Sequence, residues 1–426
     1  MNSSVKKTKP HYAWVILISC CLVNASALGL SNSNGLFYPQ ICAELGVPMS
    51  ALSLHTIVCG LSSAVTLFWV DKAYKKFNTR LILIASLLTY HLSYMSMSVF
   101  HSVTEFCIAS VFTGIASAFL YYIPIPMLIG NWFVKFRKTA LSICFVACGI
   151  SGILCSLLLG WTITTFGWRM SYLIRGMLLL IVALPVLLIR KTPEELGCRA
   201  YGADENGSDG SGSRPEPEEK VFGESAGRQS FELKRIRFVF AIFVAVSMNL
   251  SCGMTQQLPN YAASIGLGVV MGSVLTSLAM AGNIASKAAF GPLTEKFGVV
   301  KVTVCLLVLM SAGWLLPGLG VSGSAVVCAA SMTTGISACV NTLVIPNLAD
   351  TFVKGDEYIH VLARCSTGTM LASAFSLMIS SSLHDLFGSY TPVFLCYIGL
   401  LAVNIAVLII VFGKNSFLQR LLQRKK

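Results

Sequence analysis

A single lysine, Lys287, lies inside a long apolar segment in the second half of the sequence. It precedes Glu295, near the end of that segment, by eight residues, which is about 12 Å at the usual helical rise. An ammonium group in an apolar medium is costly unless water, a cavity or an anion neutralises it. Two interpretations stay open: the ammonium binds a carboxylate, or the long side chain reaches the membrane surface.

Other polar side chains share helical faces with this lysine or lie in matching apolar segments. Thr276 and Asn283 fall on one arc with Lys287, and Asn249 and Gln256 share a face of the preceding segment. Each either lines a cavity and hydrogen-bonds a substrate or holds two helices together. Tyr121 is interpreted as a gate or as a packing residue. The candidate substrate-binding residues are Lys287, Asn283, Thr276, Asn24, Asn249, Gln256 and Tyr121.

An acidic residue followed by basic residues ends an apolar segment twice. The first copy begins at Asp71 and the second includes Glu295, about half the chain later. This spacing suggests two related halves, which is typical of transporters. Charges beside helix ends can hold one conformation of such a protein. The candidate latch residues are Asp71, Lys72, Lys76, Gly291, Glu295, Lys296 and Gly298.

Composition indicates an integral membrane protein. The chain has 426 residues, of which 55% are hydrophobic and only 12% are charged, too few charges for the surface of a soluble domain. The 15 Cys show no metal-ligand spacing and lie mostly in apolar segments, so we expect neither a metal nor a cofactor. Motifs for hydrolysis or phosphate binding are not found, so the sequence does not predict an enzyme.

Twelve apolar segments are long enough to cross a bilayer as helices. The sequence therefore predicts an all-α membrane protein of two six-helix bundles. The segments run approximately over 12–37, 51–71, 79–100, 105–130, 139–161, 168–190, 236–258, 268–291, 299–318, 323–349, 361–384 and 390–412.

The distribution of cations predicts the orientation. The net charge is +13, and all but three of the Lys and Arg residues fall at the amino terminus, the carboxyl terminus, the central linker or the even-numbered turns. The exceptions are Lys287 and two residues assigned to the outer side, Arg169 and Arg175. By the positive-inside rule both termini are cytoplasmic. We expect a multi-pass protein of the plasma membrane, or of the inner membrane in a bacterium, whose charge contacts membrane lipids and not nucleic acid.

The predicted organisation has three parts. Residues 1–190 form an amino-terminal six-helix bundle, and residues 236–426 form the second bundle with a cytoplasmic tail. Residues 191–235 between them are rich in Gly, Ser, Pro and Glu, which predicts a flexible cytoplasmic linker. Ile-Pro occurs at Ile123-Pro124 and again at Ile345-Pro346, in corresponding segments of the two halves.

These features resemble the major facilitator superfamily. Its loop pattern, Gly-x-Leu-x-Asp-Arg-x-Gly-Arg-Arg, is similar to the stretch from Gly291 to Gly298, where Glu295 and Lys296 take the acidic and basic positions. In the first copy, Leu67 and Tyr74 replace the two glycines. The resemblance implies a secondary transporter that works by alternating access.

A narrower resemblance is to the monocarboxylate transporters and the oxalate/formate exchangers. It is carried by Trp14, by Asn131-Trp132-Phe133 with Arg137 and Ala140, by Gly167-Trp168-Arg169, by the stretch 192–197 and by the spacing of Lys287 and Gly291. The resemblance implies that Lys287 takes the place of an arginine that binds a carboxylate. The substrate would be a small organic anion, and a monocarboxylate is favoured because Ser366, Thr367 and Thr369 stand where the exchangers have a second cation.

Coupling and the competing functions stay open. Proton-linked carriers have an Asp where this chain has Asn283, which cannot titrate, and His55 and His91 are the other candidates. A proton or a counter-anion are both compatible with this pattern. The alternatives are a multidrug or amphiphile exporter of the same superfamily, whose helix-5 glycine-proline motif is incomplete at Gly149 and Gly152, or a carrier-like sensor that does not transport.

Overall fold

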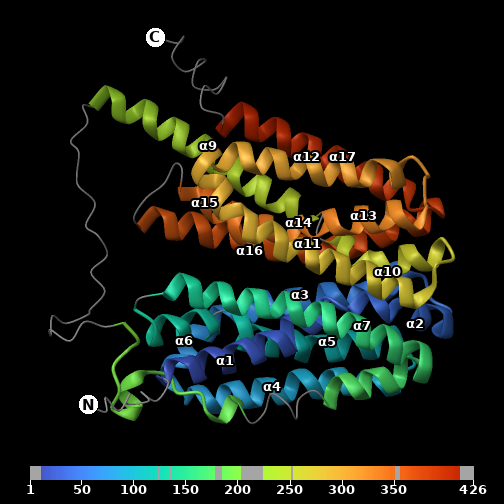
Figure 1. The fold of residues 1–426 in the computed structure, drawn as a ribbon, viewed down its shortest axis with the longest axis horizontal. Coiled ribbons are helices and arrows are strands. Elements are labelled where there is room, and N and C mark those ends of the chain that lie inside the picture. The colour runs from blue at the N-terminus through green and yellow to red at the C-terminus, as the bar shows by residue number, and fades with distance from the viewer. Residues whose placement is uncertain are drawn as a thin grey trace, which may run out of the picture.

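The protein folds into two bundles of nearly parallel helices (Figure 1). The computed structural model describes residues 11–122, 124–134, 136–177, 185–202, 224–250, 253–350 and 356–412. Within these residues there is no sheet, only one isolated bridge between Phe133 and Tyr201. The helical architecture confirms the all-α prediction, as expected for a chain whose backbone groups must bond within their own segment in lipid.

The first bundle contains the helices up to Met177. Gly167, at φ 78° and ψ 168°, interrupts the long helix α7 and turns the chain back, which a residue with a side chain would do only under strain. The elements are α1 (Ala13–Asn24), η1 (Ala25–Gly29), η2 (Asn34–Leu36), α2 (Tyr38–Leu45), α3 (Met49–Lys76), α4 (Thr79–Ser96), η3 (Met97–Val99), α5 (Val103–Ser117), η4 (Ala118–Tyr122), α6 (Pro124–Trp132) and α7 (Arg137–Met177).

The second bundle follows a short helix, η5 (Pro193–Leu196). The elements are α9 (Glu224–Leu250), α10 (Met254–Ser264), α11 (Gly268–Phe297), α12 (Val299–Gly318), α13 (Ser324–Thr334), α14 (Ile336–Cys339), η7 (Val340–Val344), α15 (Ile345–Asp350), α16 (Asp356–Phe387), α17 (Thr391–Val407) and η8 (Leu408–Phe412).

The helices account for the expected membrane crossings. Ten helices of the described part are long and apolar enough to span a bilayer. One of them is most of α7, which contains both the fifth expected segment and the start of the sixth. The eleventh expected segment lies in α16, which is rich in serine and is not among the ten.

Two helices extend further than the sequence predicted. α3 continues to Lys76 and α11 continues past Gly291 to Phe297, so Asp71 lies five residues before the end of its helix, Glu295 lies on the last turn of its helix, and neither lies in a loop. The chain breaks only at Gly298, whose φ of 85° favours glycine. Proline inside α11 does not end the helix at this point.

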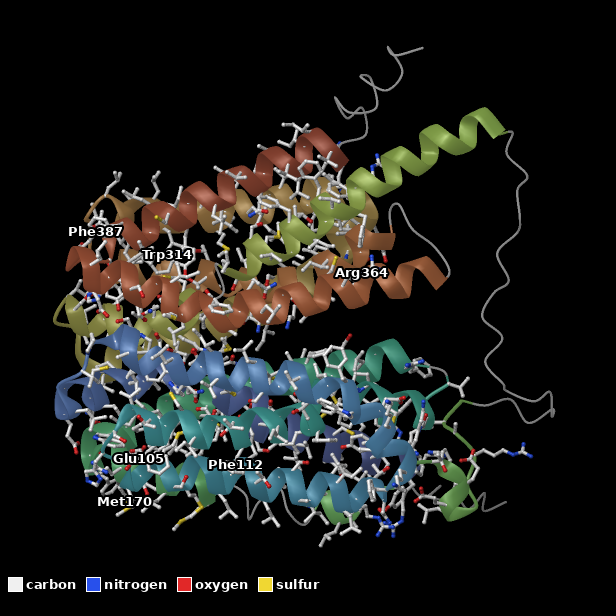
Figure 2. The ribbon with its side chains drawn as sticks, turned by 180° about the vertical axis from the view of Figure 1, so that it is seen from behind. Glu105, Phe112, Met170, Trp314, Arg364 and Phe387 are labelled. Carbon is white, nitrogen blue, oxygen red and sulfur yellow. The ribbon has the colours of Figure 1, made fainter. Side chains whose placement is uncertain are left out.

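Two faces of the molecule need names. α1 begins, α9 begins and η8 ends at the same end of the bundles, which we call the terminal face (Figure 1). α2 and α10 lie at the opposite end, which we call the distal face. Figure 2 shows Glu105, Met170 and Phe387 at the distal face and Arg364 toward the terminal face.

The two bundles touch along two helix pairs, α7 with α11 and α3 with α16, and η2 and α2 of the first bundle contact α10 of the second. Small residues allow this close approach: a Cβ added at Gly60 would lie 2.5 Å from the Cβ of Ala374. At the distal face the backbone N–H of Ser50 donates to Oδ2 of Asp385 at 2.9 Å. Among the described residues, no ion pair links the two bundles at the terminal face.

The first residues of the expected linker pack on the first bundle. Tyr201 N–H donates to the carbonyl of Trp132 at 2.8 Å, and the N–H of Val134 donates to Tyr201 at 3.1 Å. Nζ of Lys191 donates to the carbonyl of Tyr74 at 2.8 Å. Residues 191–202 are therefore anchored at the terminal face, while residues 203–223 of the expected linker lie outside the described part.

Candidate functional site

A polar cavity of about 250 Å³ lies between the two bundles. The first bundle supplies most of its wall, from the end of α1 through η2 and from α3, α4 and α5. The second bundle closes it with Gln256 of α10 and with Ser373, Ala374 and Leu377 of α16. The cavity is large enough for a small organic molecule, and its wall is rich in hydroxyl groups.

Most of these hydroxyl groups already donate their hydrogen to another group of the protein. Ser31 donates to the carbonyl of Leu28 at 2.8 Å, and Thr113 donates to Ala109 at 3.0 Å. Ser117 donates to Gly114 at 2.7 Å. Each such oxygen can still accept a hydrogen bond from a ligand. The wall therefore offers acceptors more than donors.

Arg175 stands behind one wall of the cavity. Its side chain is only 1% exposed. Nη1 donates to Oδ1 of Asn34 at 2.5 Å, and the guanidinium lies 3.6 Å from the ring centre of Tyr94. Nδ2 of Asn34 donates to the hydroxyl of Tyr94 at 3.2 Å, so the three side chains are linked. Asn34 and Tyr94 both line the cavity.

Lys287 lies at the contact between the bundles, not in the wall of this cavity. Its Nζ is 5.5 Å from the ring centre of Phe145, which belongs to the first bundle. Within the described residues no carboxylate forms an ion pair with Lys287. The ammonium is therefore partly buried between two bundles without a counter-charge from those residues.

Asn283 and Gln256 keep unused hydrogen-bonding capacity. Oδ1 of Asn283, one helical turn before Lys287, is buried without a partner. Oε1 of Gln256 is also buried without a partner, and this side chain lines the cavity. A ligand donor would satisfy either oxygen, since buried acceptors are rarely left unpaired.

Three other candidates have hydrogen bonds within the protein. Asn24 donates to the carbonyl of Cys144 at 3.1 Å and so ties α1 to α7. Thr276 is fully buried and donates to Gly272, and Asn249 donates to Ala245 at 3.0 Å. None of the three lines the cavity. The side chain of Tyr121 lies outside the described residues.

The candidate latch residues lie at the terminal face and are separate from the cavity. Asp71 pairs with Lys75 on its own helix at 2.6 Å, and both side chains are exposed. Lys76 stacks on Phe77, and Lys296 on Phe297. Lys72, Gly291, Glu295 and Gly298 are exposed.

Histidines differ in their access to the cavity. His55 lines it, with Nδ1 2.6 Å from the carbonyl of Leu52 and Nε2 3.4 Å from the hydroxyl of Tyr38. His91 is 1% exposed, does not line the cavity, and its Nε2 has no partner. Within the described residues no group of three His, Cys, Asp or Glu side chains could hold a metal ion.

Sequence reasoning missed Arg175 and the hydroxyl groups of α3 and α5. Arg175 is predicted to lie at the outer side together with Arg169, whereas in the structure its side chain is buried in the bundle. Arg169 is near the helix start, whereas Arg175 is about 9 Å further along it. This depth is the sequence feature that could have identified Arg175 as a buried residue. Serine and threonine in apolar segments do not identify a cavity in the same way, because they occur equally at helix contacts.

The sequence matches the family model of the Major Facilitator Superfamily over residues 20–285 and 240–421. Monocarboxylate transporter 6 of Mus musculus is a curated relative, 24% identical over 181 residues. That match covers 42% of the chain and 38% of the mouse protein, so the chain spans well under half of its relative's length.

Solved structures share the fold. The nucleoside transporter NupG superposes with a TM-score of 0.66 at 11% identity, covering 95% of this chain and 100% of its own. A bacterial homologue of the human lysosomal transporter Spinster gives 0.61 at 14% identity, covering 98% of each chain. Together with the two bundles and the family match across almost the whole sequence, these findings show that the protein belongs to the Major Facilitator Superfamily of membrane transporters.

Proposed function

We propose that the protein is a secondary active carrier of a small organic anion, most favourably a monocarboxylate, and that Lys287 binds the carboxylate. The observation that carries this proposal is the ammonium of Lys287, placed between the bundles beside Phe145 and without a carboxylate partner in the described part of the chain. A charge in that position is expected to serve a substrate or an ion path.

Binding at this point would couple the substrate to movement of the bundles. Lys287 belongs to the second bundle and Phe145 to the first, so an anion held there contacts groups that separate when the bundles rock. Alternating access in transporters of this kind is largely such a rigid-body movement around a fixed site. Asp71 and Glu295 at the terminal face are proposed to hold the conformation in which that face is closed.

The polar wall of the cavity supports a polar substrate over an amphiphile. An exporter of apolar molecules would need a largely apolar pocket, whereas this wall carries Asn34, Gln256 and many hydroxyl groups. The name of the mouse relative, a monocarboxylate transporter, agrees with an anion. NupG, named for nucleosides, is similar at a level that bears on the fold alone.

Uptake of labelled monocarboxylates by the purified protein in proteoliposomes tests the proposal. Removing one partner of a desolvated charge pair typically costs about 2–5 kcal/mol, or roughly 30-fold or more in affinity. Lys287→Gln is therefore expected to abolish uptake while folding is kept, because it deletes a buried charge. Lys287→Arg should retain part of the activity, since a guanidinium also binds carboxylates.

Lys301→Gln provides the matched control. Lys301 lies on the next helix, α12, and is exposed, so loss of its charge should leave uptake at the wild-type level. Wild-type uptake by Lys287→Gln at equal protein density would reject the carboxylate site and would favour the exporter or the sensor.

A further inference from the structure

The cluster of Arg175, Asn34 and Tyr94 has features that a structural role alone does not explain. Nη2 of Arg175 is buried and has no hydrogen-bond partner. A guanidinium that only fixed its helix would be expected to use its donors, since an unpaired buried donor is costly. The side chains that it contacts, Asn34 and Tyr94, form part of the cavity wall.

The charge of Arg175 is not compensated nearby. The one acidic side chain that pairs with an arginine in the described part, Glu44, binds Arg169 at the distal face. Arg175 is 1% exposed, so water screens its charge little. The cavity beside it is therefore in a positive field, which attracts an anion.

Hydrogen-bond directions add a second requirement on the ligand. The hydroxyl groups of Ser31, Thr113 and Ser117 donate to backbone carbonyls, and their oxygens can still accept hydrogen bonds from a ligand. Oε1 of Gln256, on the opposite wall, is an acceptor without a partner. A simple alkyl acid brings no donors to these oxygens, whereas an acid with several hydroxyl groups does.

We propose that this cavity, of about 250 Å³, is a subsite for a small organic acid that carries several hydroxyl groups. Its carboxylate lies against Tyr94 and Asn34 in the field of Arg175, and its hydroxyl groups donate to Gln256 and to the serine and threonine oxygens. The hydroxyl of Tyr94 accepts from Nδ2 of Asn34 and borders the hydroxyl of Tyr90, and in the proposed complex its O–H turns to the carboxylate. This inference rests on the proposed transport of an organic anion and narrows its substrate class.

Lys287 and Arg175 then mark two positions on one path. Nζ of Lys287 is 5.5 Å from the ring centre of Phe145 on α7, and Ser33, the neighbour of Asn34 in the chain, is hydrogen-bonded to Ser156 of the same helix at 2.8 Å. Eleven residues separate Phe145 from Ser156, which corresponds to about 16 Å along the helix. The acid is bound in the cavity near Arg175 and passes Lys287 on the terminal side.

Binding measurements with three probes test this subsite: gluconate, hexanoate and glucitol. Gluconate carries the acid and the hydroxyl groups, hexanoate carries the acid alone, and glucitol carries hydroxyl groups without charge. Calorimetry on the full-length protein in detergent should show gluconate binding at least about tenfold more tightly than hexanoate, because each hydrogen bond contributes about 0.5–1.5 kcal/mol.

The variants separate the two ends of the ligand. Arg175→Gln should weaken gluconate and hexanoate alike by about tenfold or more and leave glucitol unchanged, and Arg175→Lys should restore part of the loss. Gln256→Leu should weaken gluconate but not hexanoate. Arg169→Gln, six residues earlier at the distal face, is the matched control and should bind all three probes as the wild type does.

A folding defect is recognised by thermal unfolding without ligand. If Arg175→Gln unfolds, Tyr94→Phe keeps the ring and removes the proposed donor, and it should weaken both acids but not glucitol. Equal loss of gluconate and glucitol in the variant that folds, or no preference for gluconate in the wild type, overturns the subsite.

The same experiments distinguish this subsite from the proposed function. Loss of hexanoate uptake in Lys287→Gln, with Arg175→Gln and Tyr94→Phe unchanged, would reject the subsite and keep the anion carrier. Absence of binding and uptake of either acid by the wild-type protein would reject both.

Discussion

Two arginines on one helix show how position decides what a charge can do. Arg169 is partly exposed and binds Glu44 at 2.7 Å, with a further hydrogen bond to the carbonyl of Ser98. Arg175, two turns deeper, has an amide and an aromatic ring as partners and no carboxylate in the described part. The charge of Arg169 is paired with a carboxylate of the protein, whereas the charge of Arg175 is not paired in the described part and is proposed to attract an anionic ligand.

Glu44 gives a pH-dependent prediction. The hydrogen bond from Arg169, and then that from Trp168, lower the pKa of its carboxyl group. A group with a lowered pKa in the folded state stabilises the protein above its unfolded pKa, and this stabilisation is lost as the pH falls through the folded pKa. Glu44→Gln should therefore lower the melting temperature slightly at pH 7, and the difference should disappear in strong acid. An equal difference at both pH values would contradict this account. The effect stays small because the pair is exposed.

At the scale of elements, proline marks the same irregularity in both halves. The π-helical segment η4 ends just before α6, which begins at Pro124, and η7 ends just before α15, which contains Pro346. A proline lacks the N–H that a regular helix would use, and the wider π turn before it accommodates the loss. The repeated Ile-Pro pair in the sequence therefore corresponds to a repeated structural feature.

The fold was predictable from segment length and polarity, whereas the site was only partly so. The membrane-spanning segments can be predicted from runs of apolar residues, because a backbone in the hydrocarbon core must form its hydrogen bonds within a helix. Gln256 and Lys287 were identified because polar groups in such runs are few. The cavity could not be predicted, because its wall is formed by serines and threonines of several helices, and their packing in three dimensions decides which of them meet. The predicted helix end at Gly291 is wrong: the charged residues after it are typical of a turn, whereas α11 continues to Phe297.

Asp385 is predicted to hold the two bundles together at the distal face. It accepts from the N–H of Ser50 in the first turn of α3, where an anion is favoured by unpaired N–H groups and the helix dipole. Because the two residues belong to different bundles, Asp385→Ala should open the distal face more often. A cysteine at Ser373, in the cavity wall, should then react several-fold faster with a membrane-impermeant maleimide added outside the cell.

Glu44→Gln is the control for that experiment. Glu44 also lies in the last turn of its helix at the distal face, but its partners Trp168 and Arg169 belong to its own bundle. It should leave the labelling rate of the cysteine unchanged. If Asp385→Ala also leaves the rate unchanged, the contact with Ser50 does not hold the bundles together.

At the scale of the whole molecule, the contacts between the bundles are unevenly distributed. Ser50 with Asp385 lies at the distal face, and Gly60 with Ala374 lies further along the same helix pair. Beyond the contact of Lys287 with Phe145, the helices continue to Asp71 and Glu295, which are exposed. This is the pattern of a carrier that is closed at its distal face, and rocking of the bundles would move the contacts to the other end.

The orientation in the membrane is predicted from charge, and the structure supplies positions to test it. Most cations fall at the terminal face, so this face should be cytoplasmic. Cys198, exposed beside η5, should react with an impermeant maleimide only after the cells are permeabilised. Ser322 lies in the exposed loop between α12 and α13 at the distal face, and Ser322→Cys should be labelled in intact cells.

Cys305 and Cys396 are also exposed, but they lie in α12 and α17, where lipid shields them. Cys198→Ser should remove the signal that appears on permeabilisation, and labelling of Cys198 in intact cells would reverse the predicted topology.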